Sequence, residues 1–388
     1  MIRFILSLIL VFIATKSISQ KEDYTWIVNF SLDCNQSPFP ESCGASIISF
    51  KENIVEFYKE PPGLLLSCTN AVLCNRKGDP LLYSNGMSIH GKDHLAIVNG
   101  DTISYGVQWE RNYFEDVGKT AGFRIDTGAV FIPNPLHDNR YYLLYTNYDG
   151  IDSTDLLNKR YADILINDEG TASVLEKDVV FADAVNSVGQ MTCAQHANGR
   201  DWWLIQNRDD TLLTYLIDPQ GIQLYHKTMH ENSWGSFSPG VIKFSPSGTK
   251  LAINHVLQSR DSMGVELAVA DFDRCSGIVS NTNSIKTQSF ATSVFGPGLE
   301  FSSSGRFLYT NDFLKIYQYD TWADDVFSSK TLVGEYDGYF SYNPAGNIQR
   351  ETFIAQSQRG PDGKIYLASS NSNYYFHIIH DPDLPQNH

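Results

Sequence analysis

Positive charge is scarce in this sequence. Its 29 lysine and arginine residues are outnumbered by 44 acidic residues, which gives a net charge of −15, and no basic run is longer than two residues. Nucleic acids and anionic membranes are recognised through clustered lysine and arginine. The composition therefore excludes those two classes of partner.

Long hydrophobic runs are also missing after the first twenty residues, which argues against insertion into a membrane. The N-terminal stretch combines a basic Arg3, an apolar run over residues 4–14 and small residues at Ser17 and Ser19. This pattern is typical of a secretory signal peptide. We predict a signal peptide over residues 1–19 and a mature chain over 20–388 that is secreted or held at the outer cell surface. A periplasmic location follows if no sorting domain comes after His388.

The sequence has no C-x-x-C pair, so zinc binding and thiol redox chemistry have little support. Six cysteines in an exported chain permit disulfides. Cys34 and Cys43 flank a loop that contains proline and serine, and they are the candidate local disulfide. Cys193 and Cys275 stand in apolar, strand-like segments, where we expect them to be buried as small hydrophobic residues.

Helical periodicity is weak, whereas short β-branched and aromatic runs are abundant, so we predict an all-β chain. Two apolar strands joined by a tight turn recur along it, as in "VIKFSPSGTKLAIN" and "GLEFSSSGRFLYTN". Such turns favour glycine or asparagine because they require positive φ. The six predicted turn residues are Gly78, Asn139, Gly199, Gly248, Gly305 and Gly363.

Each hairpin is followed by one or two further strands, which together make a four-stranded blade. The repeat predicts one β-propeller domain of six or seven blades over residues 20–388. Strands within 24–60 close the ring, either by completing the last blade or by building part of a seventh.

The segment "HANGRDWWLIQN" could be a ligand site or a hairpin. We interpret Asn198-Gly199 as the blade turn and residues 202–205 as the second strand of the third blade, with the tryptophans packing between blades. His196 and Asp201 are expected to bond across the turn.

Several segments, in order, resemble the exported propeller proteins of Bacteroidetes-type bacteria that are often followed by a type IX secretion sorting domain. They include "GDPLLYSNGMSIHGKDH" (Gly78–His94), "QMTCAQHANGRDWWLIQ" (Gln190–Gln206) and "IIHDPDLP" (Ile378–Pro385). The resemblance implies a propeller fold and export, and it transfers no catalytic residue. Family members usually continue beyond the last motif, so we expect this chain to be a truncated version or a fragment.

No motif identifies a catalytic or cofactor site. The G-x-S-x-G motif of serine hydrolases is absent, and the blade turns lack the tryptophan of sialidase Asp-boxes. Asp149, Asp152 and Asp155 in "NYDGIDSTD" offer oxygen ligands, but the spacing differs from that of a calcium loop. No cofactor is therefore predicted, with calcium at this loop as the open alternative.

We therefore interpret the chain as a non-catalytic binding or structural module at the cell surface, serving adhesion, motility or surface assembly. A protein or glycan ligand would bind at the rim or in the channel, and the long loop over 104–123 carries aromatics that we expect to be exposed. The alternative is an extracellular glycan hydrolase that uses carboxylates in the channel.

Overall fold

The chain was analysed as a computed structural model. It describes residues 23–28, 45–51, 54–60, 63–66, 69–114, 122–123, 128–148, 156–182, 191–208, 211–229, 240–258, 263–289, 298–342, 349–369 and 375–386. The predicted signal peptide, the Cys34–Cys43 pair and the aspartates of the 149–155 loop lie outside these residues.

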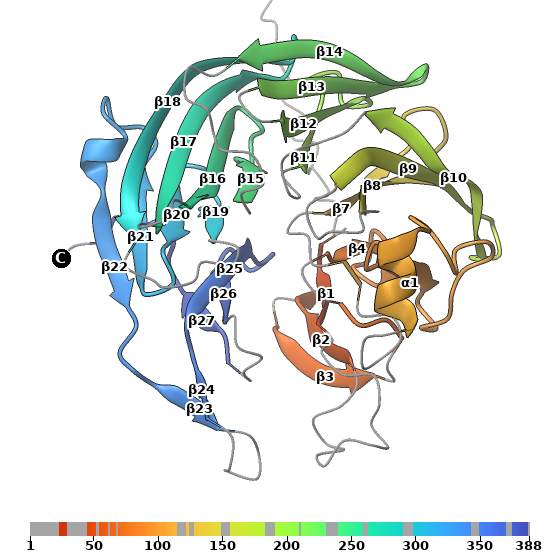
Figure 1. Cartoon of the computed structure of the whole chain (residues 1–388), viewed down its shortest axis with the longest axis horizontal. Helices are drawn as coiled ribbons and strands as arrows, with labels where there is room; N and C mark the ends of the chain where they lie inside the picture. The colour runs from red at the N-terminus through yellow and green to blue at the C-terminus, as the bar shows by residue number, and fades with distance from the viewer. Residues whose placement is uncertain are drawn as a thin grey trace, which may run out of the picture.

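Seven small antiparallel sheets surround a central axis, in chain order around the ring (Figure 1). This confirms the predicted all-β propeller and fixes the blade count at seven. One helix, α1 (Val107–Phe114), interrupts the β pattern in the connection between the second and third blades.

The first two blades have three strands each among the described residues. Their strands are β1 (Thr25–Val28), β2 (Ala45–Ser49), β3 (Glu56–Glu60), then β4 (Ala71–Cys74), β5 (Pro80–Ser84) and β6 (Ile89–Gly91). The third and fourth blades have four strands each: β7 (Ala129–Pro133), β8 (Arg140–Tyr148), β9 (Leu156–Ile166), β10 (Ala172–Ala182), then β11 (Met191–Gln195), β12 (Trp202–Arg208), β13 (Thr211–Asp218) and β14 (Gly221–Met229).

The fifth and sixth blades also have four strands, and the seventh has three. They comprise β15 (Gly240–Phe244), β16 (Lys250–Gln258), β17 (Met263–Asp273), β18 (Ile278–Ser289), then β19 (Leu299–Phe301), β20 (Phe307–Asn311), β21 (Lys315–Asp320), β22 (Thr331–Glu335), and finally β25 (Ile354–Arg359), β26 (Ile365–Ser369) and β27 (His377–Ile379). A separate hairpin of β23 (Phe340–Tyr342) and β24 (Gln349–Glu351) lies between the last two blades in the sequence.

The hydrophobic core is divided among the seven interfaces between neighbouring blades. Successive side chains of a strand point to opposite faces of its sheet. In β8, for example, Leu143 packs toward the second blade, while Leu144 packs toward the fourth. Every blade interface contains one such buried cluster. Both faces of each sheet are therefore apolar and covered by a neighbour.

The strands β1, β2 and β3 form a sheet of their own, so among the described residues they build the first blade and add no strand to the last. An aromatic cluster joins the two ends of the ring. Trp26 and Phe50 of the first blade both contact Tyr366 of the seventh, with ring centroids 5.4 and 5.6 Å apart. The ring is thus closed by side-chain packing between two blades.

The repeated turns share one hydrogen-bond pattern. In the Asn198-Gly199 turn, the backbone N–H of Gly199 donates to the carbonyl of His196, and the N–H of His196 donates to the carbonyl of Asp201. Gly199 has a φ of 73°, and the glycines of four equivalent turns also have positive φ. Glycine is favoured there because it has no Cβ to clash.

Asn139 is the exception among the six predicted turn residues. It lies in the turn between β7 and β8, but its φ is not positive. This connection is organised by Asn134, whose side-chain oxygen accepts from the backbone N–H groups of Leu136 and His137. The asparagine side chain supplies the turn geometry that a left-handed residue supplies elsewhere.

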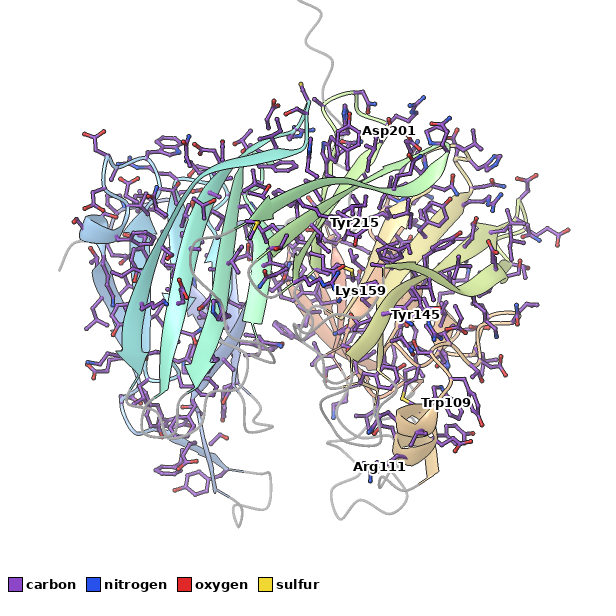
Figure 2. The ribbon with its side chains drawn as sticks, turned by 45° about the horizontal axis from the view of Figure 1, so that its top comes forward. Trp109, Arg111, Tyr145, Lys159, Asp201 and Tyr215 are labelled. Carbon is purple, nitrogen blue, oxygen red and sulfur yellow. The ribbon has the colours of Figure 1, made fainter. Side chains whose placement is uncertain are left out.

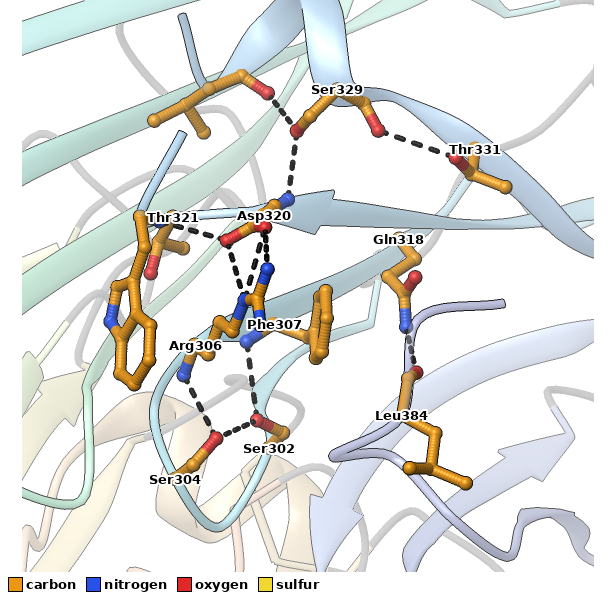
Figure 3. Close-up of polar contacts among 12 residues, drawn as sticks. Ser302, Ser304, Arg306, Phe307, Gln318, Asp320, Thr321, Ser329, Thr331 and Leu384 are labelled. Carbon is orange, nitrogen blue, oxygen red and sulfur yellow. Dashed lines mark hydrogen bonds and ion pairs between the residues drawn. The ribbon is translucent and has the colours of Figure 1, made fainter. Parts of the chain in front are cut away.

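The segment after β27 turns back onto the sixth blade (Figure 3). Tyr309 donates to the carbonyl of Pro382, and Gln318 donates to that of Leu384, both at 3.0 Å. Ser304 donates through its hydroxyl to Asp383 at 2.6 Å. In the same turn Arg306 makes a bidentate ion pair with Asp320. The "DPDLP" motif therefore links the last two blades.

Two expectations about burial, for Cys275 and for the aromatics of the 104–123 loop, were wrong. Cys275 is exposed in the turn that follows β17, because its apolar neighbours in the sequence end with the strand. Cys193 on β11 is partly buried against the core between the third and fourth blades. The aromatics of the 104–123 loop are not all exposed, since Trp109 and Phe123 are buried with Met87 beneath α1, where they cover the second blade.

Trp203 tests how far packing between blades supports the ring. Its side chain is 1% exposed, its indole N–H donates to the carbonyl of Arg274 in the next blade, and it contacts Phe272 there. Trp203→Ala should lower the free energy of unfolding by about 3–5 kcal/mol because it leaves a cavity in the core. Urea denaturation measures this loss.

Trp322→Ala is the matched control, because Trp322 is 63% exposed. Its unfolding midpoint should stay close to that of the unmodified protein. Equal losses in the two variants would show that packing between blades is not what Trp203 supplies.

Candidate functional site

The antiparallel topology gives the ring two different ends. In a four-stranded blade, the turns between strands one and two and between strands three and four must lie at one end. The connections between strands two and three, and from each blade to the next, lie at the other. We call these the turn end and the loop end. The glycine turns belong to the turn end, while α1 and the β23–β24 hairpin belong to the loop end.

The "HANGRDWWLIQN" segment is placed at the turn end of the fourth blade. Residues 202–205 belong to the second strand of the fourth blade and not, as predicted, to that of the third. The strands β1, β2 and β3 form an additional blade before those counted from the sequence. Asn198 donates to the Asp201 carboxylate at 2.7 Å, and Arg200 pairs with the same group. These bonds lower the pKa of Asp201 and hold the turn. The polar residues of its turn, from His196 to Asp201, bond to one another, while Trp203 is buried and Trp202 is half-buried.

Buried polar side chains gather at the loop end of the third to sixth blades. They stand where the second strands finish and the third strands begin, and all are nearly inaccessible to solvent. The group consists of Thr146, Asn147, Lys159, Gln206, Asn207, Thr214, Asn254, His255, Glu266, Thr310 and Asn311. The sequence contains a signal for it, because an asparagine follows the apolar residues of the second strand in "LLYTN", "LIQN", "LAIN" and "FLYTN". None of these asparagines was among the predicted site residues.

Some of these asparagines join neighbouring blades. The side-chain amide of Asn254 donates to the carbonyl of Gly298 at 3.1 Å and to the hydroxyl of Thr310 at 2.7 Å. The amide of Asn311 donates to the carbonyl of Ala355 in the seventh blade at 2.7 Å. A buried hydrogen bond of this kind is costly to lose, because the abandoned carbonyl has no water to replace it.

Lys159 is the most unusual residue of the group. It lies on β9, is fully buried, and donates to the hydroxyl of Thr146 at 2.5 Å (Figure 2). Desolvation lowers the pKa of its amine to about 7. Thr146 shares a sheet face with Leu144, which packs against the fourth blade. Lys159, directly opposite Thr146 on β9, therefore points into that interface.

Gln206 lies in the same interface on the side of the fourth blade, since it shares a face with Leu204. Neither its side-chain oxygen nor its nitrogen has a hydrogen-bond partner among the residues that the structure describes, although both are buried. Most buried polar atoms in native proteins are satisfied. The loop end of this interface is thus polar and incompletely bonded, in contrast to the apolar packing nearer the turns.

A second buried pair lies in the fifth blade. His255 Nε2 is 3.6 Å from the carboxylate of Glu266, which also lies 3.7 Å from the amine of Lys286 and accepts from the hydroxyl of Ser284 at 2.9 Å. Burial, together with the positive charge of Lys286, lowers the pKa of His255 to about 4. His255 is therefore neutral at pH 7, and Glu266 is fully enclosed.

The first strands of three blades are linked by one lysine. The Lys243 amine of β15 forms an ion pair with Glu300 of β19 and donates to Gln358 of β25 at 2.9 Å. The backbone N–H of Arg359 also donates to Glu300, at 3.1 Å. Glu300 is buried, so these contacts compensate its charge.

Another polar chain joins the first two blades. His94 Nδ1 lies 2.9 Å from the Tyr83 hydroxyl, and its Nε2 lies 2.6 Å from the Glu60 carboxylate. Tyr83 is fully enclosed, and burial raises the pKa of its hydroxyl. Because Tyr83 is inaccessible to solvent, we interpret the contacts of Tyr83, His94 and Glu60 as a structural link between β5 and β3.

The β23–β24 hairpin and the residues beside it form a group of exposed aromatic side chains at the loop end, and the hairpin extends outward from the ring (Figure 1). The exposed fractions are 50% for Tyr339, 37% for Phe340, 50% for Tyr342 and 52% for Tyr375. Tyr339 and Tyr375 are in contact, with ring centroids 6.0 Å apart. The hydroxyl of Tyr336 donates to the Tyr339 carbonyl at 3.0 Å, and that of Thr352 donates to the same carbonyl at 3.1 Å.

Among the described residues, no group of three or more histidine, cysteine, aspartate or glutamate side chains could hold a metal ion. Within the same residues, no helix has the length and apolar character needed to span a membrane.

No protein-family model and no curated protein matches the sequence. Solved structures are similar at low identity. A putative 6-phosphogluconolactonase from Bacteroides uniformis is 12% identical over 92% of this chain and 95% of its own, with a TM-score of 0.43. A protein from Lactobacillus plantarum is 10% identical over 91% and 95%, with a TM-score of 0.42. The periplasmic gluconolactonase of Pseudomonas aeruginosa is 13% identical over 64% and 87%, at 0.29. The likeness concerns the propeller fold alone.

The buried amine of Lys159 should make stability depend on pH. Its pKa is lower in the folded chain than in the unfolded chain, so between about pH 7 and pH 10 the unfolded state binds more protons, and stability rises with pH. Lys159→Met should remove this rise and increase the free energy of unfolding at pH 7 by a few kcal/mol, roughly what the buried charge costs. Urea denaturation across this pH range measures both effects.

Lys227→Met serves as the control, because Lys227 is an exposed lysine on β14. Its pH profile should match that of the unmodified protein. A Lys159→Met protein that is less stable at pH 7, with an unchanged slope, would contradict the assignment of a desolvated amine.

Proposed function

We propose that this chain is a non-catalytic, exported propeller that acts as a binding or structural module at the cell surface, with recognition at the loop end. The observation that carries the proposal is the group of four exposed aromatic side chains on and beside the β23–β24 hairpin. Apolar side chains gathered at one exposed place mark an interaction site more often than scattered ones do. The predicted signal peptide supports export.

The hairpin is held in position before any ligand arrives. Tyr336 and Thr352 both donate to the Tyr339 carbonyl, and the ring of Tyr336 packs on Phe353 at 5.1 Å. Ser341 between the exposed Phe340 and Tyr342 is buried. A surface that is already ordered loses little conformational entropy on binding. This order suits recognition better than a solvated loop would.

The contacts of the buried carboxylates favour binding over hydrolysis. A glycosidase needs two carboxyl groups facing the substrate at a set separation. Glu300 is committed to Lys243 and to the backbone of Arg359, while Glu266 is fully enclosed. Neither is presented to a substrate at the surface, so we rank the channel hydrolase below the binding module.

The proposal extends to the family that the sequence motifs resemble. The ordered motifs from Gly78 to Pro385 support a place among exported Bacteroidetes-type propellers associated with type IX secretion. Such a protein would act in adhesion, motility or surface assembly, through a protein or glycan partner. This part of the proposal is tested by fractionating the native cells. It predicts that the chain is recovered in the outer-surface fraction.

Binding to the native cell envelope tests the proposed role. The purified chain should be retained by intact envelopes of the source cells, and Phe340→Ala combined with Tyr342→Ala should weaken retention at least tenfold by removing the exposed rings. Sedimentation with envelopes gives the bound fraction.

The matched control combines Phe57→Ala with Tyr58→Ala, which removes one exposed phenylalanine and one exposed tyrosine from β3. Its retention should equal that of the unmodified protein. No retention of the unmodified chain, or equal losses in both double variants, would reject the loop-end recognition surface.

A further inference from the structure

One face of the β23–β24 hairpin presents two aromatic rings side by side. Phe340 and Tyr342 are two residues apart on β23, so they point to the same side of the ribbon. Glu351 of β24 lies directly opposite Phe340 in the register. Side chains paired in this way are neighbours on one face. The face therefore combines two ring surfaces with a carboxylate.

The surroundings of this face are acidic. Asp337 accepts from the backbone N–H of Tyr339 at 2.9 Å, and Glu335 at the end of β22 pairs with Lys315 at 3.3 Å. Asp337 and Glu351 thus give this segment two carboxylates, while the charge of Glu335 is balanced by Lys315, on a protein of net charge −15. An anionic polymer would be repelled from this place. The ligand must therefore be neutral or cationic.

The size of the patch favours a small, repetitive ligand. Stable protein interfaces bury roughly 800 Å² on each partner and draw on about 20–30 residues. Here the exposed apolar surface consists of four aromatic side chains. Tyr339, Phe340 and Tyr342 lie on or next to one narrow ribbon, and Tyr375 lies beside it. These side chains are all aromatic, which suits a ligand that packs flat against rings.

We propose that the face formed by Phe340 and Tyr342, with Tyr339 and Tyr375 beside it, binds a neutral polysaccharide chain. The C–H surfaces of successive sugar rings would pack on the two aromatic rings, because a polarised C–H group is attracted to the negative face of an aromatic ring. The sugar hydroxyls would donate to nearby carboxylate oxygens and exchange hydrogen bonds with tyrosine hydroxyls. This inference rests on the proposed function and names the ligand class of the same surface.

Affinity electrophoresis tests the inference with the full chain. Native gels would contain hydroxyethylcellulose, xylan or galactomannan as neutral probes, polygalacturonate as an anionic probe, or no polysaccharide. We expect at least one neutral polymer to retard the protein and polygalacturonate to have no effect. Phe340→Ala with Tyr342→Ala should raise the dissociation constant at least tenfold, whereas Phe57→Ala with Tyr58→Ala should leave it unchanged.

A conservative pair separates ring stacking from other effects. Phe340→Tyr combined with Tyr342→Phe keeps both rings and only moves one hydroxyl group from position 342 to position 340. Binding should therefore stay within about threefold of the unmodified chain, as expected for the loss of one modest hydrogen bond. Near-ultraviolet circular dichroism confirms that each variant is folded. Loss of binding in this pair equal to that in the double alanine variant would overturn stacking as the mode of recognition.

The remaining outcomes separate this inference from the proposed function. If no neutral polymer binds, while envelope retention still depends on Phe340 and Tyr342, the polysaccharide assignment fails and the binding module stands. Capture of a lysine-rich peptide through the same rings would likewise overturn it in favour of a cationic protein partner. If neither envelopes nor polymers are bound, both proposals fall.

Discussion

The structure depends on one constraint, which is that every blade is apolar on both faces. A single sheet can bury neither face alone, so each blade is stable only between two neighbours. The ring satisfies this for all seven sheets at once, with one buried cluster in every interface. Closure is therefore as important as any blade, and Trp26, Phe50 and Tyr366 provide it where the chain's first and last blades meet.

The same constraint applies differently at the two ends of the ring. At the turn end, short connections satisfy the backbone, and the interfaces are sealed by large apolar groups such as Trp203. At the loop end, the strands finish in asparagine, threonine and glutamine, and Lys159 is enclosed without a carboxylate partner among the described residues. A buried amine of this kind lowers stability, because desolvation disfavours its charged form. Apolar packing near the turn end therefore contributes most to the stability of the blade interfaces, whereas their buried polar side chains lie near the loop end.

The sequence was most informative where local patterns and long-range packing agree. The alternating strands and the Asn198-Gly199 turn indicate both the blade and the position of Trp203, because a hairpin sets its own register. It was less informative where packing overrides local pattern. Trp109 appears in a polar loop of the sequence, yet it lies on α1, which packs the indole ring against Met87. Cys275 lies two residues beyond the end of β17, in the turn where the chain has left the core.

The candidate site shows the same limit more sharply. The aromatics of "EYDGYFSYNPAGN" are visible in the sequence, but an aromatic-rich segment is equally typical of core. What distinguishes them is their place in the fold, since within the part of the chain that the structure describes β23 pairs with β24 alone and joins no blade. No neighbouring sheet covers Phe340 and Tyr342 as it would cover them within a blade. The residues most suited to recognition are thus those that the ring constraint does not reach, and a connection between blades can change its ligand without disturbing the fold.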